Sequence, residues 1–245
     1  MIDNIRDWDI KDNRKHEYDL GQYKKIYRST EMFVDWIDGK ILGSKRILDM
    51  CCGGGANLRY LAERFPNIEF RGVDIVKSNI ELAEKMLNSY DNVSVNVDDL
   101  YNLNLQDYKD KYSGVIMLQT LSWLPDYKDA MQAIANINPD WIALTSLFYE
   151  GNVEYKVEVT DYTRVDDKHN CLNCYSNIYS IPRFKEFLKG LGYTKFSYVK
   201  FDIDIDIERQ VEDGIGTYTR KMEDGSRIQI SAGMMFPWYF VLAER

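Results

Sequence analysis

The sequence has few cysteines, few prolines, only two histidines and no long apolar run, and each scarcity argues against a class of protein. Four cysteines among 245 residues do not suggest the disulfide framework of a small secreted scaffold. No apolar run approaches the ~20 residues of a membrane-spanning helix, so we expect no membrane partner. Lys and Arg number 31 against 39 Asp and Glu, a net charge of -8, and this excess of acids disfavours nucleic acid as a partner. We expect a cytoplasmic protein that acts on a small molecule.

The chain has the length and composition of one large α/β domain. Hydrophobic residues make up 45% of it, which is enough for a core. Residues 1 to about 20 are polar and show no clear period, whereas apolar residues from Tyr23 to Ile37 recur on one helical face. We therefore divide the chain into an N-terminal arm with a lid helix at 1–40 and a main, ligand-binding domain at 41–245.

The most informative stretch is Ile47–Asn57. It opens with a short apolar run that includes Asp49 and is typical of a buried parallel strand. Three consecutive glycines at 53–55 then allow a tight turn and a close approach of the backbone to a ligand, before a helix that begins at about Ala56. This strand, turn and helix predict a ligand site at the carboxyl end of the strand.

Two nucleotide-binding fingerprints compete for this turn. The dinucleotide pattern G-x-G-x-x-G needs a glycine in its sixth position, but counting from Gly53 that position is Leu58. The order Asp49-x-Cys51-x-Gly53-x-Gly55 instead resembles motif I of class I S-adenosylmethionine (SAM) dependent methyltransferases. That family usually has glycine where this chain has Cys51. The resemblance implies SAM as the cofactor, with Asp49, Cys51, Gly53 and Gly55 around its methionine part.

Further acids follow the next two predicted strands. Asp74, followed by Ile75, lies about 20 residues past the glycine turn, which is the spacing at which a carboxylate reaches the ribose hydroxyls of a nucleotide. The resemblance places another acid after the third strand, beside the adenine amino group. Asp99, followed by Leu100, is the better match there, and Asp98 is the runner-up.

Strands and helices alternate along the first 148 residues, which predicts a parallel, doubly wound sheet of the α/β class. The expected strands are 47–50, 68–74, 93–97, 112–118 and 141–148. Ser78-x-x-Glu81 predicts a capping box for the helix after the second strand. Two long terminal strands, 196–207 and 228–243, are expected to pair antiparallel. The resemblance thus implies a Rossmann-like, seven-stranded, mostly parallel sheet with an antiparallel C-terminal strand pair and a lid insertion.

Three side chains outside these motifs are candidates for the methionine end of the cofactor. Tyr23, Tyr27 and Arg28 offer the hydroxyls and the cation that a carboxylate needs, although Tyr27 as a core residue and Arg28 as a solvated charge remain the alternative reading. Gln119 follows the fourth strand, where the resemblance places the backbone close to the sulfonium. The N/D-P-P-Y/F motif, common in amino-group methylation of DNA bases or protein glutamine, is missing at this point.

The alternation stops at about residue 149, and residues 149–180 are expected to form an insertion that covers the substrate as a lid. Glu150, Asp161 and His169 within it are candidate catalytic bases for a proton on the acceptor. The ordinary pKa of His169 suits neutral pH best, while an ordinary surface role is the alternative for each of the three. A hairpin extension is expected at about 209–231.

Two groups of side chains could suggest a metal, and neither pattern is complete. His169, Cys171 and Cys174 could supply three zinc ligands, but a second Cys or His pair is missing, so free thiols in a loop are the alternative that we prefer. The acids at 202, 204 and 206 alternate with apolar residues and are explained as the solvated face of an edge strand. We predict no metal site.

The resemblance covers residues 40–245 and implies methyl transfer to an oxygen or nitrogen of a small polar molecule. Residues 146–151 and 235–239 are also similar to segments of bacterial small-molecule methyltransferases found with glycan or capsule biosynthesis, for which a sugar or a phosphoramidate would be the acceptor. The alternatives are a non-catalytic SAM-binding partner protein and a nucleic-acid methyltransferase, with a nicotinamide-dependent oxidoreductase as the outsider.

Overall fold

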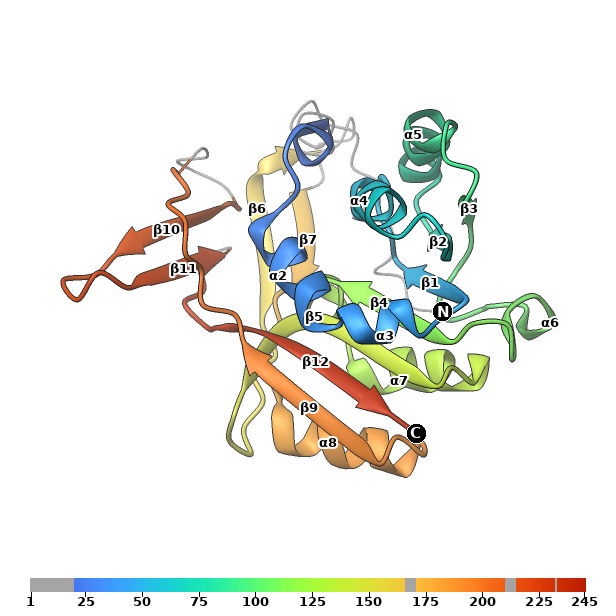
Figure 1. Cartoon of the computed structure of the whole chain (residues 1–245). Coiled ribbons are helices and arrows are strands. Elements are labelled where there is room, and N and C mark those ends of the chain that lie inside the picture. The colour runs from blue at the N-terminus through green and yellow to red at the C-terminus, as the bar shows by residue number, and fades with distance from the viewer. Residues whose placement is uncertain (1–19, 166–170, 210–214, 232) are drawn as a thin grey trace.

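A twisted, mostly parallel sheet forms the centre of the molecule, and helices cover both of its faces (Figure 1). The computed structural model describes residues 20–165, 171–209, 215–231 and 233–245. The strand order is β3-β2-β1-β4-β5-β12-β9, and β8 pairs with the end of β5 as an eighth strand. The predicted fold class is therefore confirmed.

The strands that build the sheet are β1 (Arg46–Met50), β2 (Glu69–Asp74), β3 (Val93–Val97), β4 (Gly114–Leu118), β5 (Trp141–Tyr149), β8 (Tyr179–Ser180), β9 (Lys195–Lys200) and β12 (Trp238–Glu244). Neighbours among β1 to β5 pair in parallel, so their carboxyl ends meet at one edge. The C-terminal strand β12 runs antiparallel to both β5 and β9. Its pairing with β9 is the predicted antiparallel C-terminal strand pair.

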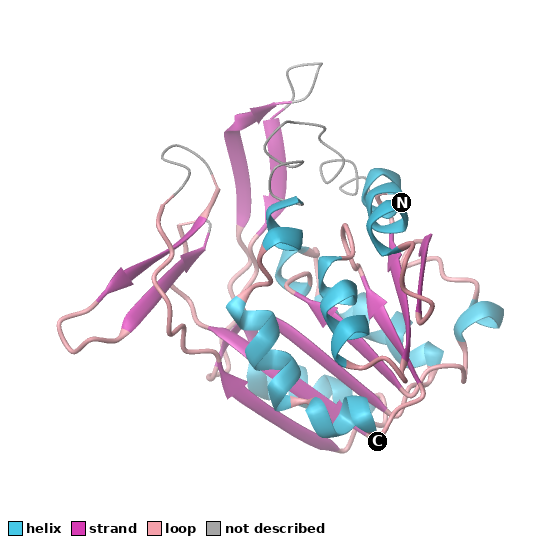
Figure 2. Cartoon of the chain, turned by 45° about the horizontal axis from the view of Figure 1, so that its top comes forward, coloured by secondary structure: helices cyan, strands magenta, loops and turns pink. Residues whose placement is uncertain are grey.

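Two helical layers bury opposite faces of this sheet (Figure 2). The first layer contains α2 (Arg28–Trp36), α3 (Asp38–Leu42), α4 (Ala56–Arg64) and α5 (Lys77–Leu87). The second contains α6 (Leu105–Tyr108), the 3-10 turn η2 (Leu121–Trp123), α7 (Tyr127–Ile137) and α8 (Ile181–Gly190). Side chains of the strands alternate between the two cores, so that Phe240 packs edge-to-face on Phe33 at 5.5 Å while its neighbour Tyr239 faces α8.

Local sequence explains where several helices begin and end. Asp126 accepts a hydrogen bond from the backbone N–H of Lys128 and so caps α7, and Ser180 caps α8 in the same way. Pro66 follows α4 and cannot continue it. The capping box predicted at Ser78 is wrong, because α5 begins at Lys77 and Ser78 therefore lies inside its first turn.

The terminal strands are shorter than the alternating pattern predicted. β9 ends at Lys200, and residues 201–207 continue without strand structure, with Asp204 held by Arg28 and Asp206 held by Arg227. The acids at 202, 204 and 206 are exposed and alternate with buried or half-buried apolar residues, as predicted, but they do not lie on an edge strand, and that part of the prediction is corrected. The segment 228–243 likewise divides into β11 (Arg227–Ser231) and β12 instead of forming one strand.

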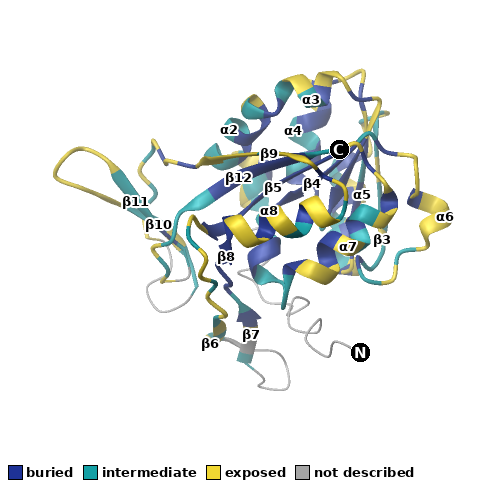
Figure 3. Cartoon of the chain, turned by 90° about the horizontal axis from the view of Figure 1, so that it is seen from below, coloured by how far each residue is buried: buried dark blue, intermediate teal, exposed yellow. Residues whose placement is uncertain are grey.

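Two hairpins project from the sheet. The expected hairpin within 209–231 consists of β10 (Thr217–Lys221) and β11 (Arg227–Ser231), which extend into solvent (Figures 1 and 3). The insertion after β5 contains a second hairpin, β6 (Glu158–Val165) and β7 (Cys171–Tyr175), at the carboxyl edge of the parallel strands (Figure 2). Among the residues that the structure describes, no helix has the length and apolar character needed to cross a membrane.

The close packing of the sheet against the glycine turn predicts that Gly72 tolerates no side chain. A Cβ at this position on β2 would lie 2.4 Å from Leu58 Cδ1 and 2.8 Å from Cys52 Sγ. We expect Gly72→Ala to lower the free energy of unfolding by about 1–3 kcal/mol, measured by chemical denaturation.

The matched control is Gly39→Ala, because a Cβ on Gly39 within α3 would meet no atom within 4 Å. This change should leave stability equal or raise it by roughly 0.5–1 kcal/mol. Equal effects of the two substitutions would contradict the packing described here.

Candidate cofactor site

The glycine turn between β1 and α4 places three residues in the left-handed conformation. Their φ angles are +62° at Cys51, +56° at Gly53 and +85° at Gly55. A Cβ on Gly55 would lie 2.9 Å from both Ala83 Cβ and Leu87 Cδ1, so this position accepts glycine only. Cys51 adopts a conformation that favours glycine at a cost of about 1–2 kcal/mol, which explains why glycine is usual at this place in the motif.

Asp74 holds this turn against the end of β2. Its Oδ2 accepts a hydrogen bond from the backbone N–H of Gly53 at 2.9 Å, and its Oδ1 accepts from Val76 N–H at 2.9 Å and from Asn79 Nδ2 at 3.2 Å. The carboxylate thereby fixes both the turn after β1 and the start of α5. Ile75, directly after Asp74, is an exposed apolar residue at this edge.

Asp49 lies beside Asp74 but has a different environment. Its side chain is 1% exposed, and its Oδ2 has no hydrogen-bond partner among the described residues. Burial, and secondly the negative charge of Asp74, raise the pKa of Asp49 to about 8. At neutral pH this carboxyl group is therefore protonated, whereas Asp74 receives donors that favour its charged form.

Asp99, the predicted acid after β3, lies near enough to the turn to act on Cys51. Burial, followed by the charges of Asp74, Asp49 and Asp99, raises the pKa of the Cys51 thiol, so these carboxylates surround one position. Asp99 accepts from the backbone N–H of Tyr101 at 3.0 Å.

The two alternatives at this position have different surroundings. Asp98 accepts a hydrogen bond from the Tyr108 hydroxyl. Asn96 joins the same network, because its Nδ2 donates to the Tyr108 hydroxyl and its Oδ1 accepts from Arg71 Nε. Leu100, next to Asp99, is buried. These contacts favour Asp99 over Asp98 as the residue that faces a ligand.

The segment at the start of α2 covers the turn from the other side. The Tyr23 hydroxyl donates to the carbonyl of Gly54, and Thr30 Oγ1 donates to Asn57 Oδ1 at 3.0 Å. Because the Gly54 carbonyl and the first turn of α4 are both engaged, residues 23–30 form a cover over the turn. Tyr23 is 5% exposed and contacts the turn, while its role at the methionine end of a cofactor stays a prediction.

Gln119 joins this cover to the end of β4. Its φ is +57°, its side-chain Nε2 donates to Ser29 Oγ at 2.9 Å, and its backbone N–H donates to Thr145 Oγ1 at 2.8 Å. No sequence pattern indicates the roles of Ser29, Thr30 and Thr145, because single hydroxyl residues carry no spacing signal.

Arg28 is not directed at the turn in the same way. Its Nε lies 3.0 Å and its Nη2 2.8 Å from the carboxylate of Asp204, and its Nη1 lies 3.2 Å from Glu31. These ion pairs join α2 to the segment after β9. The guanidinium group is therefore engaged with protein carboxylates rather than held ready for a ligand.

The three candidate bases do not converge. Asp161 is buried and accepts hydrogen bonds from Thr163 N–H at 2.9 Å and from Ile215 N–H at 3.1 Å, so it ties β6 to the segment just before β10. Glu150 accepts from the Tyr239 hydroxyl at 3.0 Å, on the α8 side of the sheet and away from the core that α2 covers. His169 lies outside the described residues.

The base of the insertion is fastened to the segment after β4 through Asn177. Asn177 is fully buried, its Nδ2 donates to the carbonyl of Leu124 at 2.9 Å, and its Oδ1 accepts from Val157 N–H at 3.0 Å. Its backbone N–H donates to the Ser122 carbonyl at 2.8 Å. One residue thus connects the insertion to the chain that follows Gln119.

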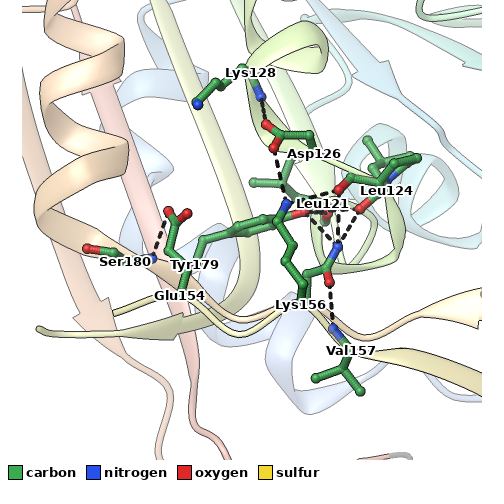
Figure 4. Close-up of polar contacts among 11 residues, drawn as sticks. Leu121, Leu124, Asp126, Lys128, Glu154, Lys156, Val157, Tyr179 and Ser180 are labelled. Carbon is green, nitrogen blue, oxygen red and sulfur yellow. Dashed lines mark hydrogen bonds and ion pairs between the residues drawn. The ribbon is translucent and has the colours of Figure 1, made fainter. Parts of the chain in front are cut away.

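Tyr179 and Lys156 strengthen the same connection. The Tyr179 hydroxyl donates to the carbonyl of Leu124 at 3.0 Å, and Lys156 Nζ reaches the Pro125 carbonyl at 3.0 Å and Asp126 Oδ2 at 3.1 Å (Figure 4). The Lys156 ammonium also lies 5.1 Å from the centre of the Tyr179 ring. We refer to Asn177, Tyr179 and Lys156 as the insertion clamp.

Cys171 and Cys174 lie on β7, and neither is part of a disulfide bond. Within the described part of the chain, no group of three or more His, Cys, Asp or Glu side chains is arranged to hold a metal ion. His169, the third ligand of the zinc pattern, is not among the residues described.

The part of the chain that contains the glycine turn is similar to a known family of protein domains. Residues 47–138 match the family model of a methyltransferase domain, and this segment contains the glycine turn, Asp74, Asp99 and Gln119. This match, together with the fold, supports the class I S-adenosylmethionine-dependent methyltransferase superfamily. It agrees with the resemblance predicted from the Asp49 to Gly55 motif.

Individual methyltransferases are distant from this one. A malonyl-[acyl-carrier protein] O-methyltransferase of Bacillus anthracis is 28% identical over 131 residues, which cover 53% of this chain and 46% of the relative. An uncharacterized protein, RP028, of Rickettsia prowazekii is 31% identical over 108 residues, or 43% of each chain. This chain therefore aligns with about half of the length of these curated relatives.

The similarity in fold covers more of the chain than the similarity in sequence. The N-terminal domain of EvdMO1, solved in the presence of SAH and D-fucose, superimposes with a TM-score of 0.58 at 11% identity. The match covers 96% of this chain and 97% of that domain. At such low identity the likeness shows a common fold.

The insertion clamp predicts a large loss of stability when Asn177 is removed. Asn177→Ala leaves the Val157 N–H and the Leu124 carbonyl without their partner in a buried place, and should lower the free energy of unfolding by about 2–3 kcal/mol. Asn152→Ala, at an exposed site of the same insertion, should stay within about 0.5 kcal/mol. Similar denaturation midpoints for the two variants would contradict the clamp.

The raised pKa of Asp49 predicts a pH dependence of stability. The unfolded chain loses this proton near its ordinary pKa of 3.8 and the folded chain only near 8, so the folded state binds more protons between these values. Stability should therefore fall as pH rises through this window, by up to about 1.4 kcal/mol per pH unit from this group. Asp49→Asn should remove that part of the slope in denaturation measured from pH 5 to 8, and an unchanged slope would contradict the assignment.

Proposed function

We propose that this chain transfers a methyl group from SAM to an oxygen or nitrogen of a small polar molecule. The observation that carries the proposal is the Asp74 carboxylate, which is fixed by Gly53 and Val76 N–H groups at the junction of the left-handed turn and α5. A carboxylate at the carboxyl end of the second strand, beside a glycine turn, is placed where nucleotide-binding folds hold the ribose hydroxyls of their ligand.

The residues around Asp74 fit the rest of such a cofactor. The exposed side chain of Ile75 offers an apolar surface for the adenine ring, and Asp99 offers an acceptor for its amino group. A Cβ on Gly53 would meet no atom within 4 Å, so the backbone of the turn is open to a ligand. The unpartnered Oδ2 of Asp49 is a further buried acceptor beneath this turn.

SAM would supply a methyl group on a sulfonium, a leaving group that is already activated. The contribution of the protein is then to align the acceptor with that methyl group and to exclude water, and such alignment can account for several kcal/mol of a barrier, about 7–11 in the best intramolecular cases. Gln119, held by Ser29 and Thr145 at the end of β4, is the residue that we place beside the reacting groups.

An acceptor with a sugar or phosphoramidate group, as in bacterial capsule or glycan biosynthesis, is the finer proposal. The EvdMO1 neighbour was solved with D-fucose, and the named curated relative is an O-methyltransferase, which both favour an oxygen acceptor. The net charge of -8 favours a neutral acceptor over a polyanion. A cytoplasmic location stays a prediction from the sequence.

Two of the candidate bases, Asp161 and Glu150, make hydrogen bonds within the protein. Asp161 is surrounded by hydrogen-bond donors, and Glu150 is turned to Tyr239, so neither is available without rearrangement. His169 stays a prediction from its ordinary pKa. We propose that alignment contributes more to this reaction than general base catalysis.

Two alternatives predict other behaviour. A non-catalytic SAM-binding partner protein would bind the cofactor and methylate none of the acceptors offered. A nucleic-acid methyltransferase would bind RNA or DNA, for which the excess of 39 acidic over 31 basic residues is unfavourable.

Calorimetric titration with S-adenosylhomocysteine, the demethylated form of SAM, tests the cofactor. We expect micromolar affinity for it and no binding of NAD. Asp74→Ala should weaken binding at least about tenfold, equivalent to ~1.4 kcal/mol, because the ribose acceptor and the order of the turn are both lost.

Asp91→Ala is the control, since Asp91 is an exposed acid in the loop before β3 and its replacement should leave the affinity unchanged. Circular dichroism of each variant shows whether it is folded. No binding by the folded wild-type chain, or equal affinity of NAD, would refute the proposed cofactor. Transfer of labelled methyl groups to a panel of sugars and phosphoramidates then separates an enzyme from a silent binding protein.

A further inference from the structure

A groove with a volume of about 240 Å³ opens at the amino edge of the parallel strands. Its walls include Arg46 on β1, Arg71 on β2, Ser94 on β3 and Tyr112 just before β4. These strands run parallel, so the glycine turn and Asp74 lie at the other end of them. The groove is therefore a separate place from the cofactor site.

Arg71 brings a half-buried positive charge to this groove. Its Nε donates to Asn96 Oδ1 at 2.7 Å, its Nη1 to the Tyr112 hydroxyl at 3.3 Å and its Nη2 to the Tyr108 hydroxyl at 3.5 Å. A guanidinium group carries five N–H donors, so the other two have no acceptor among the described residues. The three acceptors are uncharged, and Asp98 joins the network only through the Tyr108 hydroxyl. Arg71 thus lacks a carboxylate in direct contact within the described chain.

Two tyrosines hold this guanidinium group in place. Its central carbon lies 4.8 Å from the centre of the Tyr108 ring, and the rings of Tyr108 and Tyr112 stack with their centres 6.2 Å apart. Both rings are buried. The Tyr112 hydroxyl accepts from Arg71, while its own proton has no acceptor among the described residues. The groove therefore presents a fixed cation and a hydroxyl donor side by side.

The remaining charged groups of the groove limit the charge of a ligand. Arg46 Nε donates to Glu69 Oε2 at 2.8 Å, so these two side chains neutralise each other. Asp91 is an exposed acid that also lines the groove, and it forms no ion pair within the described chain. The charge of Arg71 attracts one negative charge, whereas Asp91 opposes a second one. A singly charged ligand fits this balance better than a dianion.

We propose that this groove binds a small carboxylate through Arg71 and Tyr112. The planar guanidinium group suits the two oxygens of a carboxylate, and the Tyr112 hydroxyl adds a further donor. At ~30 Å³ for each water in the liquid, the groove has the volume of roughly eight waters, which suits a short-chain acid and is too small for a nucleotide. This site is independent of the proposed methyl transfer, and binding changes no covalent bond.

The experiment is a titration of the isotope-labelled full chain with butyrate, followed by the amide resonances in NMR spectra at constant ionic strength. We expect saturable shifts at Arg71, Ser94 and Tyr112, with a dissociation constant on the order of 1 mM, and no shift at the glycine turn. Inorganic phosphate in a parallel titration should bind more weakly, because of its second negative charge.

Substitutions then test the two donors. Arg71→Gln should weaken butyrate binding at least about tenfold, and Tyr112→Phe, which keeps the stacked ring, about threefold or more. Arg183→Gln removes an equal charge from the exposed face of α8, away from the groove, and should leave the affinity unchanged. Circular dichroism shows whether each variant is folded.

The wild-type titration is decisive even if Arg71→Gln does not fold. The absence of saturable shifts, or shifts confined to residues outside the groove, would overturn the proposal. Unchanged affinity in folded Arg71→Gln, or in Tyr112→Phe, would contradict the assigned donors. Tighter binding of phosphate than of butyrate would refute the carboxylate as the ligand class. None of these results depends on whether S-adenosylhomocysteine binds at the other edge of the sheet.

Discussion

The hydrogen bonds of the Asp74 carboxylate are the constraint on which the site depends. They join the turn after β1 to the start of α5, and therefore fix the carboxyl ends of two parallel strands relative to each other. The left-handed residues of the turn bring their backbone close to this point, and the absence of a Cβ on Gly55 lets α5 approach. The cover at residues 23–30 then closes over the same turn through Tyr23 and Thr30.

A second set of contacts connects the site to the insertion after β5, which lies outside the parallel core. The insertion clamp fastens residues 154–157 and 176–180 to the segment after β4, so the insertion and the chain that follows Gln119 form one packed unit (Figure 4). An acceptor that contacts the insertion would therefore be held relative to Gln119. This arrangement agrees with a reaction in which alignment matters more than a base.

The sequence predicted the parts of the fold that carry a strong pattern. The alternation of apolar strands and helices up to β5 predicted the parallel sheet, and the spacing of Asp49, Gly53 and Asp74 predicted that these residues meet at the carboxyl edge of that sheet. Long-range pairing was not predictable, because nothing local signals that Asp204 pairs with Arg28 or that Asp161 binds Ile215. For this reason the end of β9 was misjudged, and the contacts of Asp161 were not foreseen.

Buried polar residues show the same limit. Asn177 occurs in a polar insertion and looks like an ordinary loop residue, yet it is fully buried and makes the central contacts of the clamp. Conversely, the acid at Asp49 was expected from the motif, but its unpartnered oxygen and raised pKa result from the packing of Asp74 and the turn around it. Only the three-dimensional neighbours determine which acid of a motif is charged.

The measurement that tests the account most directly is a crystal structure of this chain with S-adenosylhomocysteine. The account predicts the ribose hydroxyls within hydrogen-bond distance of Asp74, the adenine between Ile75 and Asp99, and the amino-acid end at the turn near Asp49. A ligand bound away from the carboxyl ends of β1 and β2, or one that does not contact Asp74, would contradict it.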